Sequence, residues 1–328
     1  MPGSRASVFG EAEDFQAALS ADGVAGLQVT GRGQLRARLT QVRLDGCRLA
    51  AVEEALSRIA FVAVPAGMVL VSFPIGQGPS PVWGGIEVRT GEILTLGPGQ
   101  RVHARTPGRA HWSAIQVPDQ ELAQYGCALN GARFVVPPVA RWRPPPAVAR
   151  QLRSLHRPAI RMAEARAGAL TDLQAAHGLE QQLLHALIEC LAEGAEEETA
   201  TGRRHRDILA RFEDLLVAEP SAGVADICAA LGVSQRSLRD CCKEHLCMGP
   251  SRYRYLCATQ QVHRALRRGN SDTTKVSEVA ARCGFRGLGR FATRYRVLYG
   301  ELPSATLRRA SNPGVVELAL GRPRIKLS

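Results

Sequence analysis

Two basic segments near the C-terminal end of the chain carry residue types that suit nucleic-acid recognition. The first follows Gly232 and the second follows Gly284, and a small residue, Cys228 or Ala280, stands four positions before each glycine. A glycine lets the backbone turn sharply, and a small residue lets two helices cross closely. This spacing predicts two helix-turn-helix units, each followed by a basic recognition helix for the major groove of DNA.

The first recognition helix is expected to begin after Ser234, whose hydroxyl can accept a hydrogen bond from an early backbone N–H. Residues at the start of such a helix reach the base edges, so Gln235 and Arg236 are the candidates for base contact. Arginine suits guanine and glutamine suits adenine. Arg239 and Lys243 lie further along and are expected to contact phosphates. A surface salt bridge with a neighbouring acid is the alternative for both arginines.

The second recognition helix is expected to begin near Arg286. Arg286 and Arg290 are the candidates for base or phosphate contact, with Gly287 exposed between them, and Arg294 and Arg296 are expected nearer phosphate. Gly287 also weakens the start of the helix, as does a second glycine two residues on, each by roughly 1 kcal/mol. We therefore expect this start to become ordered on DNA.

Three further helices are expected around the two units. One runs over 206–218, one over 224–231 with Ser221 as its cap, and a long one over 252–268 joins the units. Two recognition helices in one chain could meet successive major grooves about 34 Å apart. The arrangement predicts a non-palindromic site of roughly two helical turns per monomer, and a homodimer would bind two copies.

The charge of the chain is concentrated in the same region. Residues 203–328 contain 23 Lys and Arg against 11 Asp and Glu, a net charge of +12, whereas residues 1–202 contain 19 of each. A basic domain suits the phosphate backbone of DNA. A general preference for arginine would not place the whole excess in one part of the chain.

The C-terminal third resembles the DNA-binding domain of the AraC/XylS family of bacterial transcription regulators. Its second unit is most similar to the subgroup that includes the ethanolamine-operon regulator. The chain departs from the family at Ala258-Thr259, where an Arg-Leu pair is usual, and at Cys242, Cys247 and Gly249. The residues that carry the resemblance are 231–234, Arg236, Leu238, Arg239, Pro250, Tyr253, Ala280, Gly284, Phe285, Phe291, Tyr295, Gly300 and Pro303.

The region before this domain is predicted to be rich in β-strands. Residues 1–22 are expected to form a short surface helix, and short strands with Gly and Pro turns follow over 24–136, which favours a barrel or sandwich. The alternation of apolar residues changes phase at Thr40-Gln41, which suggests a bulge. One predicted hairpin, over 86–103, is similar to that of a cupin-like jelly roll, the domain with which AraC relatives commonly sense a small molecule.

No metal site or other cofactor is expected in the β-rich region. Cupin enzymes bind a metal through several histidines and a glutamate, but His103 and His111 stand alone here and residues 24–85 contain no histidine. A single histidine could supply at most one ligand. We expect both to be ordinary histidines of the β-rich domain.

Helices are predicted over 145–192, the first ending before Pro158. The second has an apolar stripe at helical spacing from Leu173 to Leu191. This stripe could pack on the β-rich domain or form a dimer interface, and both interpretations stay open. The acidic, small-residue segment over 193–202 is typical of a linker.

These observations predict an α+β chain with three regions. Residues 1–200 are expected to form a ligand-sensing and dimerisation domain, 203–310 the double helix-turn-helix domain, and 311–328 a flexible tail. The sequence has no membrane span and no signal peptide, and its odd number of cysteines suits a reducing cytoplasm.

The leading hypothesis is a transcription regulator, an activator gated by a small-molecule effector that is bound in the N-terminal barrel. Its partners would be double-stranded DNA, RNA polymerase, the effector and a second copy of the chain. One alternative is a ligand-independent regulator whose N-terminal domain only dimerises. The other is an enzyme on the β-rich domain, but the sequence contains no nucleophile motif and no phosphate-binding loop.

Overall fold

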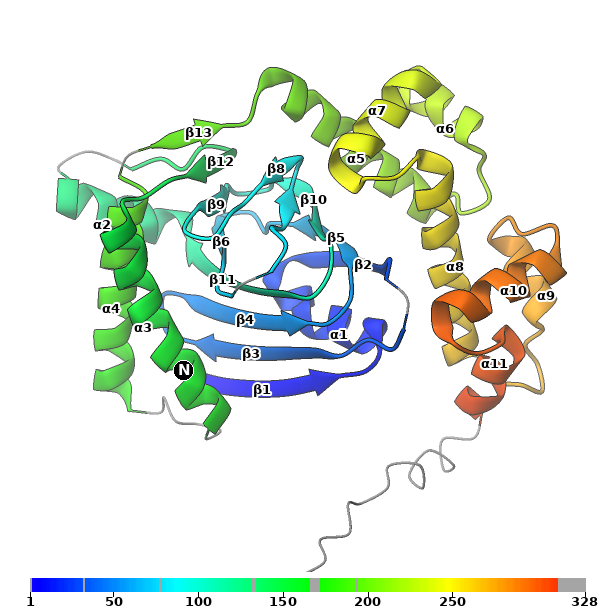
Figure 1. Cartoon of the computed structure of the whole chain (residues 1–328), viewed down its shortest axis with the longest axis horizontal. Helices are drawn as coiled ribbons and strands as arrows, with labels where there is room; N and C mark the ends of the chain where they lie inside the picture. Colours follow the sequence, from blue (N-terminus) through cyan, green and yellow to red (C-terminus); the bar gives the residue numbers. More distant parts are fainter. Residues whose placement is uncertain are drawn as a thin grey trace, which may run out of the picture.

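The computed structural model describes residues 2–31, 33–76, 78–130, 134–165, 172–192 and 194–311. A β-rich region with several helices is followed by an all-helical region that begins near residue 200 (Figure 1). The predicted combination of a β-rich N-terminal region and a helical C-terminal region is therefore confirmed. None of the helices in the described ranges combines the length and the hydropathy that a bilayer crossing needs.

The larger sheet has eight strands in the order β1-β3-β4-β11-β6-β9-β12-β13, and every neighbouring pair is antiparallel. Its central strands are buried on both faces because each face packs against another layer. The strands are β1 (Gly3–Phe9), β3 (Ala37–Arg43), β4 (Arg48–Glu54), β6 (Met68–Pro74), β9 (Ile93–Leu96), β11 (Ala110–Pro118), β12 (Val139–Trp142) and β13 (Ala195–Glu197).

The smaller sheet has five strands in the order β2-β5-β10-β7-β8. Apolar side chains from both sheets form one core between them, to which Phe15 and Leu19 of helix α1 (Ala12–Leu19) contribute. The pairing of the described strands gives two facing sheets and does not show a closed barrel. The strands are β2 (Val24–Val29), β5 (Arg58–Ala63), β7 (Val82–Trp83), β8 (Ile86–Glu87) and β10 (Arg101–Thr106).

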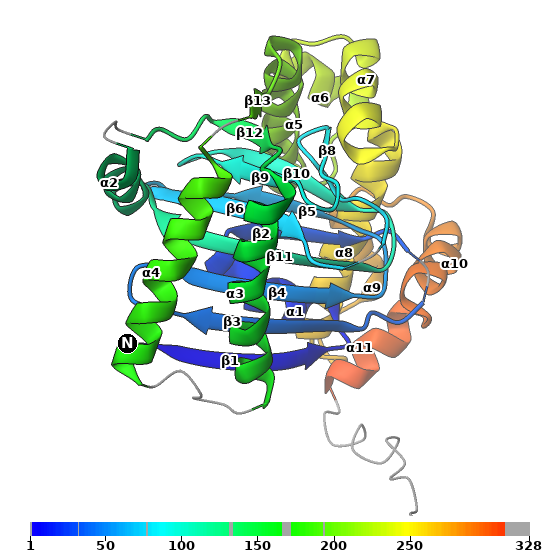
Figure 2. The ribbon, with the colours of Figure 1, turned by 60° about the vertical axis from the view of Figure 1, so that its left-hand side comes forward.

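Helices α3 (Pro146–Ala165) and α4 (Leu173–Cys190) cover the other face of the larger sheet (Figure 2). The apolar stripe of α4 from Leu183 to Leu191 is buried in the core that these helices share with the sheet. The stripe therefore packs within the chain, and only Leu173 at its start is largely exposed. Packing on the sheet is thus the interpretation that the structure supports for this stripe.

Four local expectations for the N-terminal region were wrong. Residues 3–9 form an edge strand, and the helix after it is buried, with Phe15 inaccessible. Residues 119–130 form helix α2 (Asp119–Asn130), where strands were expected. Helix α3 continues through Pro158, and its buried face on the sheet offsets the lost backbone hydrogen bond. Three residues of the expected linker form β13, which pairs with β12.

The expected bulge at Thr40-Gln41 was also wrong. Strand β3 pairs with β4 without any shift in register. The phase of the apolar residues changes because both faces of β3 are covered: Leu39 points into the core between the sheets and Val42 into the core under α3 and α4. Thr40 is buried as well and donates a hydrogen bond to Glu164 of α3.

In the described part of the C-terminal region, seven helices are held together by two separate apolar cores. The first core joins α5, α6, α7 and the start of α8, and the second joins the end of α8 to the remaining helices. The predicted tail lies, from residue 312 onward, outside the described residues. The helices are α5 (Ala200–Ala218), α6 (Val224–Leu231), α7 (Gln235–Leu246), α8 (Pro250–Arg268), α9 (Val276–Arg282), α10 (Leu288–Tyr299) and α11 (Pro303–Ser311).

Candidate nucleic-acid interface and the contact between the domains

The first helix-turn-helix consists of α6 and α7, which meet at Gly232 with a left-handed φ of 67°. The Ser234 hydroxyl accepts a hydrogen bond from the Ser237 backbone N–H at 3.0 Å, which confirms it as the N-cap of α7. Helix α6 begins differently from the prediction. Its N-cap is Gly223, whose N–H donates to the Asp226 carboxylate at 3.1 Å, and Ser221 is not the cap.

Helix α7 has one buried and one exposed face, as its sequence predicts. Leu238, Cys241 and Cys242 are fully buried. The candidate contact residues lie on the exposed face, and the side chain of Arg236 is 92% exposed. Its guanidinium lies 4.0 Å from Asp240, a distance at which an exposed ion pair contributes little. The exposed candidates on this helix are Gln235, Arg236, Arg239 and Lys243.

The second unit consists of α9 and α10, which are joined by a turn at Gly284 with φ of 82°. Helix α10 begins at Leu288, two residues later than expected, so Arg286 lies in the turn. Its N-cap is Gly287, which has no side chain to accept a backbone N–H. The start of this recognition helix therefore lacks the cap that Ser234 gives to α7.

The candidate contact residues of the second unit are also exposed, but one of them has a partner. The guanidinium of Arg294 lies over the Tyr255 ring of α8, 5.3 Å from its centroid. Arg294 therefore also packs onto the helix that joins the units. The exposed residues are Arg286, Gly287, Arg290, Arg294 and Arg296.

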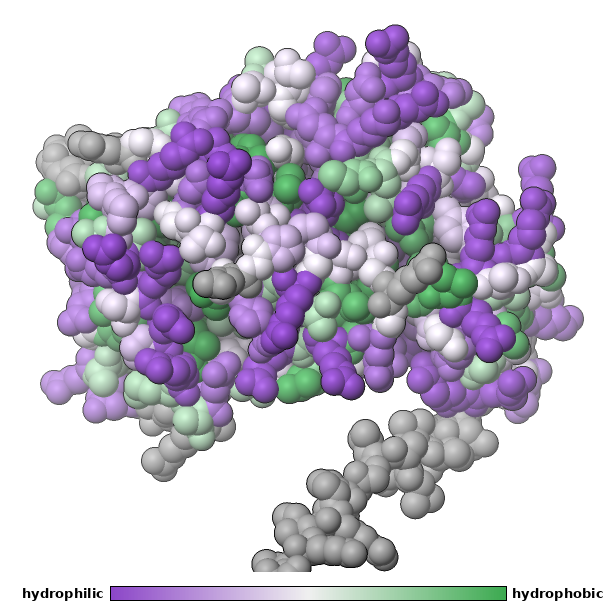
Figure 3. All heavy atoms as spheres, in the orientation of Figure 1, coloured by the Kyte–Doolittle hydropathy of each residue, from purple (hydrophilic) through white to green (hydrophobic). Residues whose placement is uncertain are grey.

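The two units lie at opposite ends of α8, and hydrophilic side chains dominate the surface around α7 (Figures 1 and 3). A close contact joins the units near the start of this helix. A methyl group on Gly284 would lie 3.0 Å from Cα of Ser221, and Arg254 of α8 donates to the carbonyl of Pro220 at 3.4 Å. The turn of the second unit thus packs closely against the loop before α6.

The β-rich domain contacts the first unit through an acidic residue of α5. Tyr253 of α8 donates a hydrogen bond to the Glu213 carboxylate at 2.9 Å, and Nε2 of His103 lies 3.3 Å from the same oxygen. Beside them, Arg101 of β10 pairs with Asp214. His103 is therefore part of the contact between the two domains, a role that the sequence did not predict.

Polar residues of α8 form a second contact with the β-rich domain. The Gln260 amide donates to the Leu27 carbonyl at 2.6 Å and also contacts Gln28. Arg264 contacts Gln16, and Arg267 pairs with Glu13 of α1 at 3.2 Å. The spacing of Gln260, Arg264 and Arg267 places them on one face of the helix, but no pattern in the sequence indicates that this face meets another domain.

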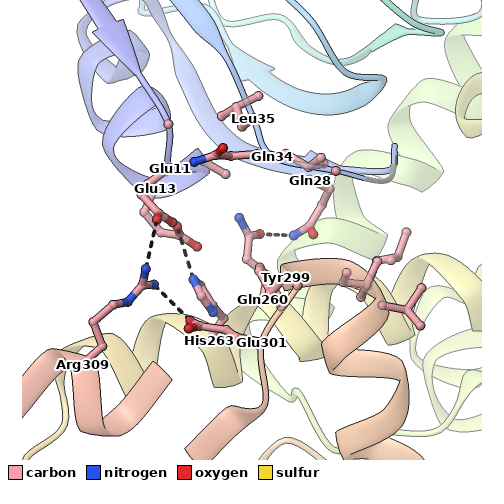
Figure 4. A pocket seen from close by; sticks show the side chains of 18 residues that line it. Glu11, Glu13, Gln28, Gln34, Leu35, Gln260, His263, Tyr299, Glu301 and Arg309 are labelled. Carbon is pink, nitrogen blue, oxygen red and sulfur yellow. Dashed lines mark hydrogen bonds and ion pairs between the residues drawn. The ribbon is translucent and has the colours of Figure 1, made fainter. Parts of the chain in front are cut away.

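A cavity of about 400 Å³ lies beside this contact and is lined by both domains (Figure 4). Glu11, Glu13 and Gln28 line it from the β-rich side, and His263 and Arg309 line it from the helical side. Arg309 lies 3.7 Å from the Glu11 carboxylate. The cavity between the two sheets, by contrast, has a volume of only about 10 Å³.

Burial alters the ionisation of groups around this cavity. Desolvation raises the pKa of Glu11, although Arg267 and Arg309 act in the opposite direction. Desolvation lowers the pKa of His263 to about 4, so its ring is neutral near pH 7. The neutral ring stacks on Tyr299 with centroids 3.9 Å apart. The cavity wall thus combines carboxylates, a neutral imidazole and an arginine.

The cysteines do not suggest redox chemistry. All nine are free thiols. Burial raises the pKa of the Cys47 and Cys190 thiols to about 12, and it also raises that of Cys242, which suppresses the reactive thiolate form. Cys247 has a left-handed φ of 54°, at the position after α7 where glycine is usual in the family it resembles.

Comparison with known proteins supports the predicted DNA-binding region. A family model described as a helix-turn-helix domain matches residues 227–309. Over 76 residues the chain is 36% identical to the XylDLEGF operon transcriptional activator of Pseudomonas putida, and these residues are 23% of this chain and 24% of that protein. Over 77 residues it is 38% identical to XylDLEGF operon transcriptional activator 3 of Pseudomonas putida, which corresponds to 24% of this chain and 23% of that protein.

The match thus spans about a quarter of the length of these relatives. The crystal structure of the AraC-like transcriptional activator CuxR aligns with 85% of this chain and 99% of its own, at 14% identity and a TM-score of 0.41. Residues 227–309 are a helix-turn-helix domain like that of XylS/AraC-type activators, as predicted. The likeness to the ethanolamine-operon subgroup is not confirmed by these relatives and stays a prediction.

Proposed function

We propose that this chain is a sequence-specific, DNA-binding transcription regulator of the AraC/XylS type. The arrangement of the C-terminal region carries the proposal: two helix-turn-helix units lie on one long helix, each with an exposed, basic recognition helix. The matched relatives are transcriptional activators and point to a regulator rather than an enzyme. We also propose activation of transcription, a homodimer and contact with RNA polymerase.

The exposed residues divide into two roles in this proposal. Gln235 and Arg236 read base edges at the start of α7, and Arg286 and Arg290 do so around the start of α10. Ser234 holds the start of α7, and Gly287 lets the backbone before α10 approach the duplex closely. The residues that bind phosphates are Arg239, Lys243, Arg294 and Arg296.

The effector is proposed to bind in the cavity between the domains. A cavity of about 10 Å³ between the sheets holds at most one water molecule, whereas about 400 Å³ beside α8 suits a small organic molecule. Glu11, Glu13 and Glu301 favour a ligand that carries hydrogen-bond donors. Such a ligand contacts both domains and would shift the population between their arrangements.

DNA binding is tested by footprinting the purified chain on its genomic sites and measuring affinity against salt. We expect an asymmetric footprint of about two helical turns and an affinity that falls steeply as salt rises. Arg236→Ala is expected to cost ~1–3 kcal/mol and to relax specificity at one base pair. Equal binding of wild type and Arg236→Ala to every single-base variant of the site would contradict this assignment.

Coupling between the domains is tested with Gln260→Ala, which removes the hydrogen bond to Leu27. We expect DNA affinity to change because the position of α8 against the β-rich domain is loosened. Gln261→Ala is the matched control, since Gln261 donates to Leu216 of α5 at 3.0 Å, a contact within the helical domain. If both variants bind the operator like wild type, the contact has no part in regulation.

A further inference from the structure

Three potential metal ligands meet where the first helix-turn-helix contacts the β-rich domain. His205 lies on α5, and Glu244 and His245 lie in the last turn of α7. The coordinating atoms of the three side chains all lie within 4.8 Å of one another. Nδ1 of His205 is 2.5 Å from one Glu244 oxygen, and Nε2 of His245 is 3.8 Å from the other.

His245 lacks the partners that a buried histidine normally has. Its side chain is fully buried, and neither ring nitrogen makes a hydrogen bond within the described residues. A buried polar group without a partner costs roughly 1–3 kcal/mol.

The turn between β7 and β8 leaves room beside this histidine. Gly85 has a left-handed φ of 85°, and a methyl group there would lie 3.3 Å from both the Glu244 oxygen and Nε2 of His245. The absence of a side chain at Gly85 keeps the space next to the two ligand atoms open. The unpartnered imidazole therefore lies against the Gly85 backbone, at the contact between the two domains.

We propose that His205, Glu244 and His245 bind a divalent transition-metal ion, with Zn²⁺ as the representative ion. Two imidazoles and one carboxylate suit zinc and its neighbours, and a water molecule would complete a four-coordinate shell. Zinc holds nitrogen ligands at about 2.0–2.1 Å, so the ligands close slightly around the ion. Glu244 is 43% exposed and is free to make that movement.

A second group of this kind, Glu11, Glu13 and His263, is a weaker candidate. Its carboxylates pair with Arg267 and Arg309, whose positive charges oppose a bound cation. At the His205 group, the bound ion would tie α5 to the end of the first recognition helix. The metal would therefore stabilise the first unit and its contact with the β-rich domain.

The test is Zn²⁺ binding to the full chain without an affinity tag, by titration calorimetry and by the metal content after dialysis. We expect one tightly bound ion and a rise in Tm. His205→Gln should weaken binding by at least about 10–100-fold, the loss typical of removing only an outer-shell partner. His245→Gln should do the same and also remove the rise in Tm. His185→Gln is the matched control, because His185 forms a similar pair with Glu189 on α4.

Co²⁺ spectra separate this site from the cysteines, since thiolate ligands give intense near-ultraviolet charge-transfer bands that imidazole and carboxylate do not. Because His205 is partly exposed, His205→Gln is expected to fold, which circular dichroism and metal-free Tm will check. The proposal is overturned if a folded His205→Gln binds Zn²⁺ like wild type. Thiolate bands, or failure of the wild type to bind Zn²⁺, would overturn it as well.

Discussion

The two helix-turn-helix units have the same motif but differ in how firmly the rest of the chain holds them. The first unit has a side-chain cap on its recognition helix, and its core includes Ile59 of the β-rich domain. The second has an uncapped recognition helix and a smaller core made only by helical-domain residues. The same sequence motif can thus be held by different amounts of capping and core packing within one protein.

The largest effect is expected where the two units touch. Gly284→Ala forces a left-handed φ on alanine and places a methyl group against the Ser221 backbone, so we expect a loss of about 2–4 kcal/mol in the free energy of unfolding. Gly300→Ala is the control, because Gly300 has a similar φ of 76° but open space around it. Urea unfolding of both variants measures the difference. Equal losses would show that the contact between the units contributes nothing.

Acid should weaken the second unit through His263. Its pKa is about 4 in the folded chain, below the value of 6.5 in the unfolded chain, so the unfolded state binds more protons as pH falls. The stability that depends on the neutral His263 ring is fully present above pH 6.5 and is lost as the pH falls from 6.5 to 4. At pH 5 the loss in the free energy of unfolding is on the order of 1–2 kcal/mol. Urea unfolding from pH 7 to 5 measures it. His263→Gln should flatten this dependence, and an unchanged pH profile in that variant would contradict the prediction.

The smallest effects concern the two caps and should have opposite signs. Ser234→Ala removes the hydrogen bond to Ser237 and should cost about 1 kcal/mol in the first unit. Gly287→Ser supplies a missing cap and should add a few tenths of a kcal/mol to the second. Amide hydrogen exchange in α7 and in α10 measures the change in local stability of each helix. Loss of stability in both variants would show that the start of α10 does not accept a cap.

Local patterns carried most of the successful sequence predictions. The glycines at 232 and 284, the serine at 234 and the buried face of α7 follow from spacings of a few residues, and the structure confirms them. The predicted helix end before Pro158 was wrong because the sheet that holds this helix in place comes from distant parts of the chain. The predicted bulge at Thr40 was wrong because a strand that is buried on both faces does not alternate between apolar and polar residues.

The contact between the domains could not be predicted for a similar reason. His103, Glu213 and Tyr253 lie far apart in sequence, and each has a reasonable role in its own domain. The same holds for His205 and Glu244, whose separation of 39 residues matches no familiar metal motif. Residues like these are brought together by tertiary packing, which leaves no periodic signal in the sequence.

Under the proposed function, helix α8 would set the spacing between the two recognition helices on DNA. Its 19 residues extend about 28 Å, close to one turn of the duplex, and a unit is attached at each end. A helix of this length does not stretch, so a ligand bound at the β-rich domain would leave the length of α8 between the two units unchanged. Under the proposed function, an effector would therefore change whether the two recognition helices are available to DNA, but not the spacing that they fit.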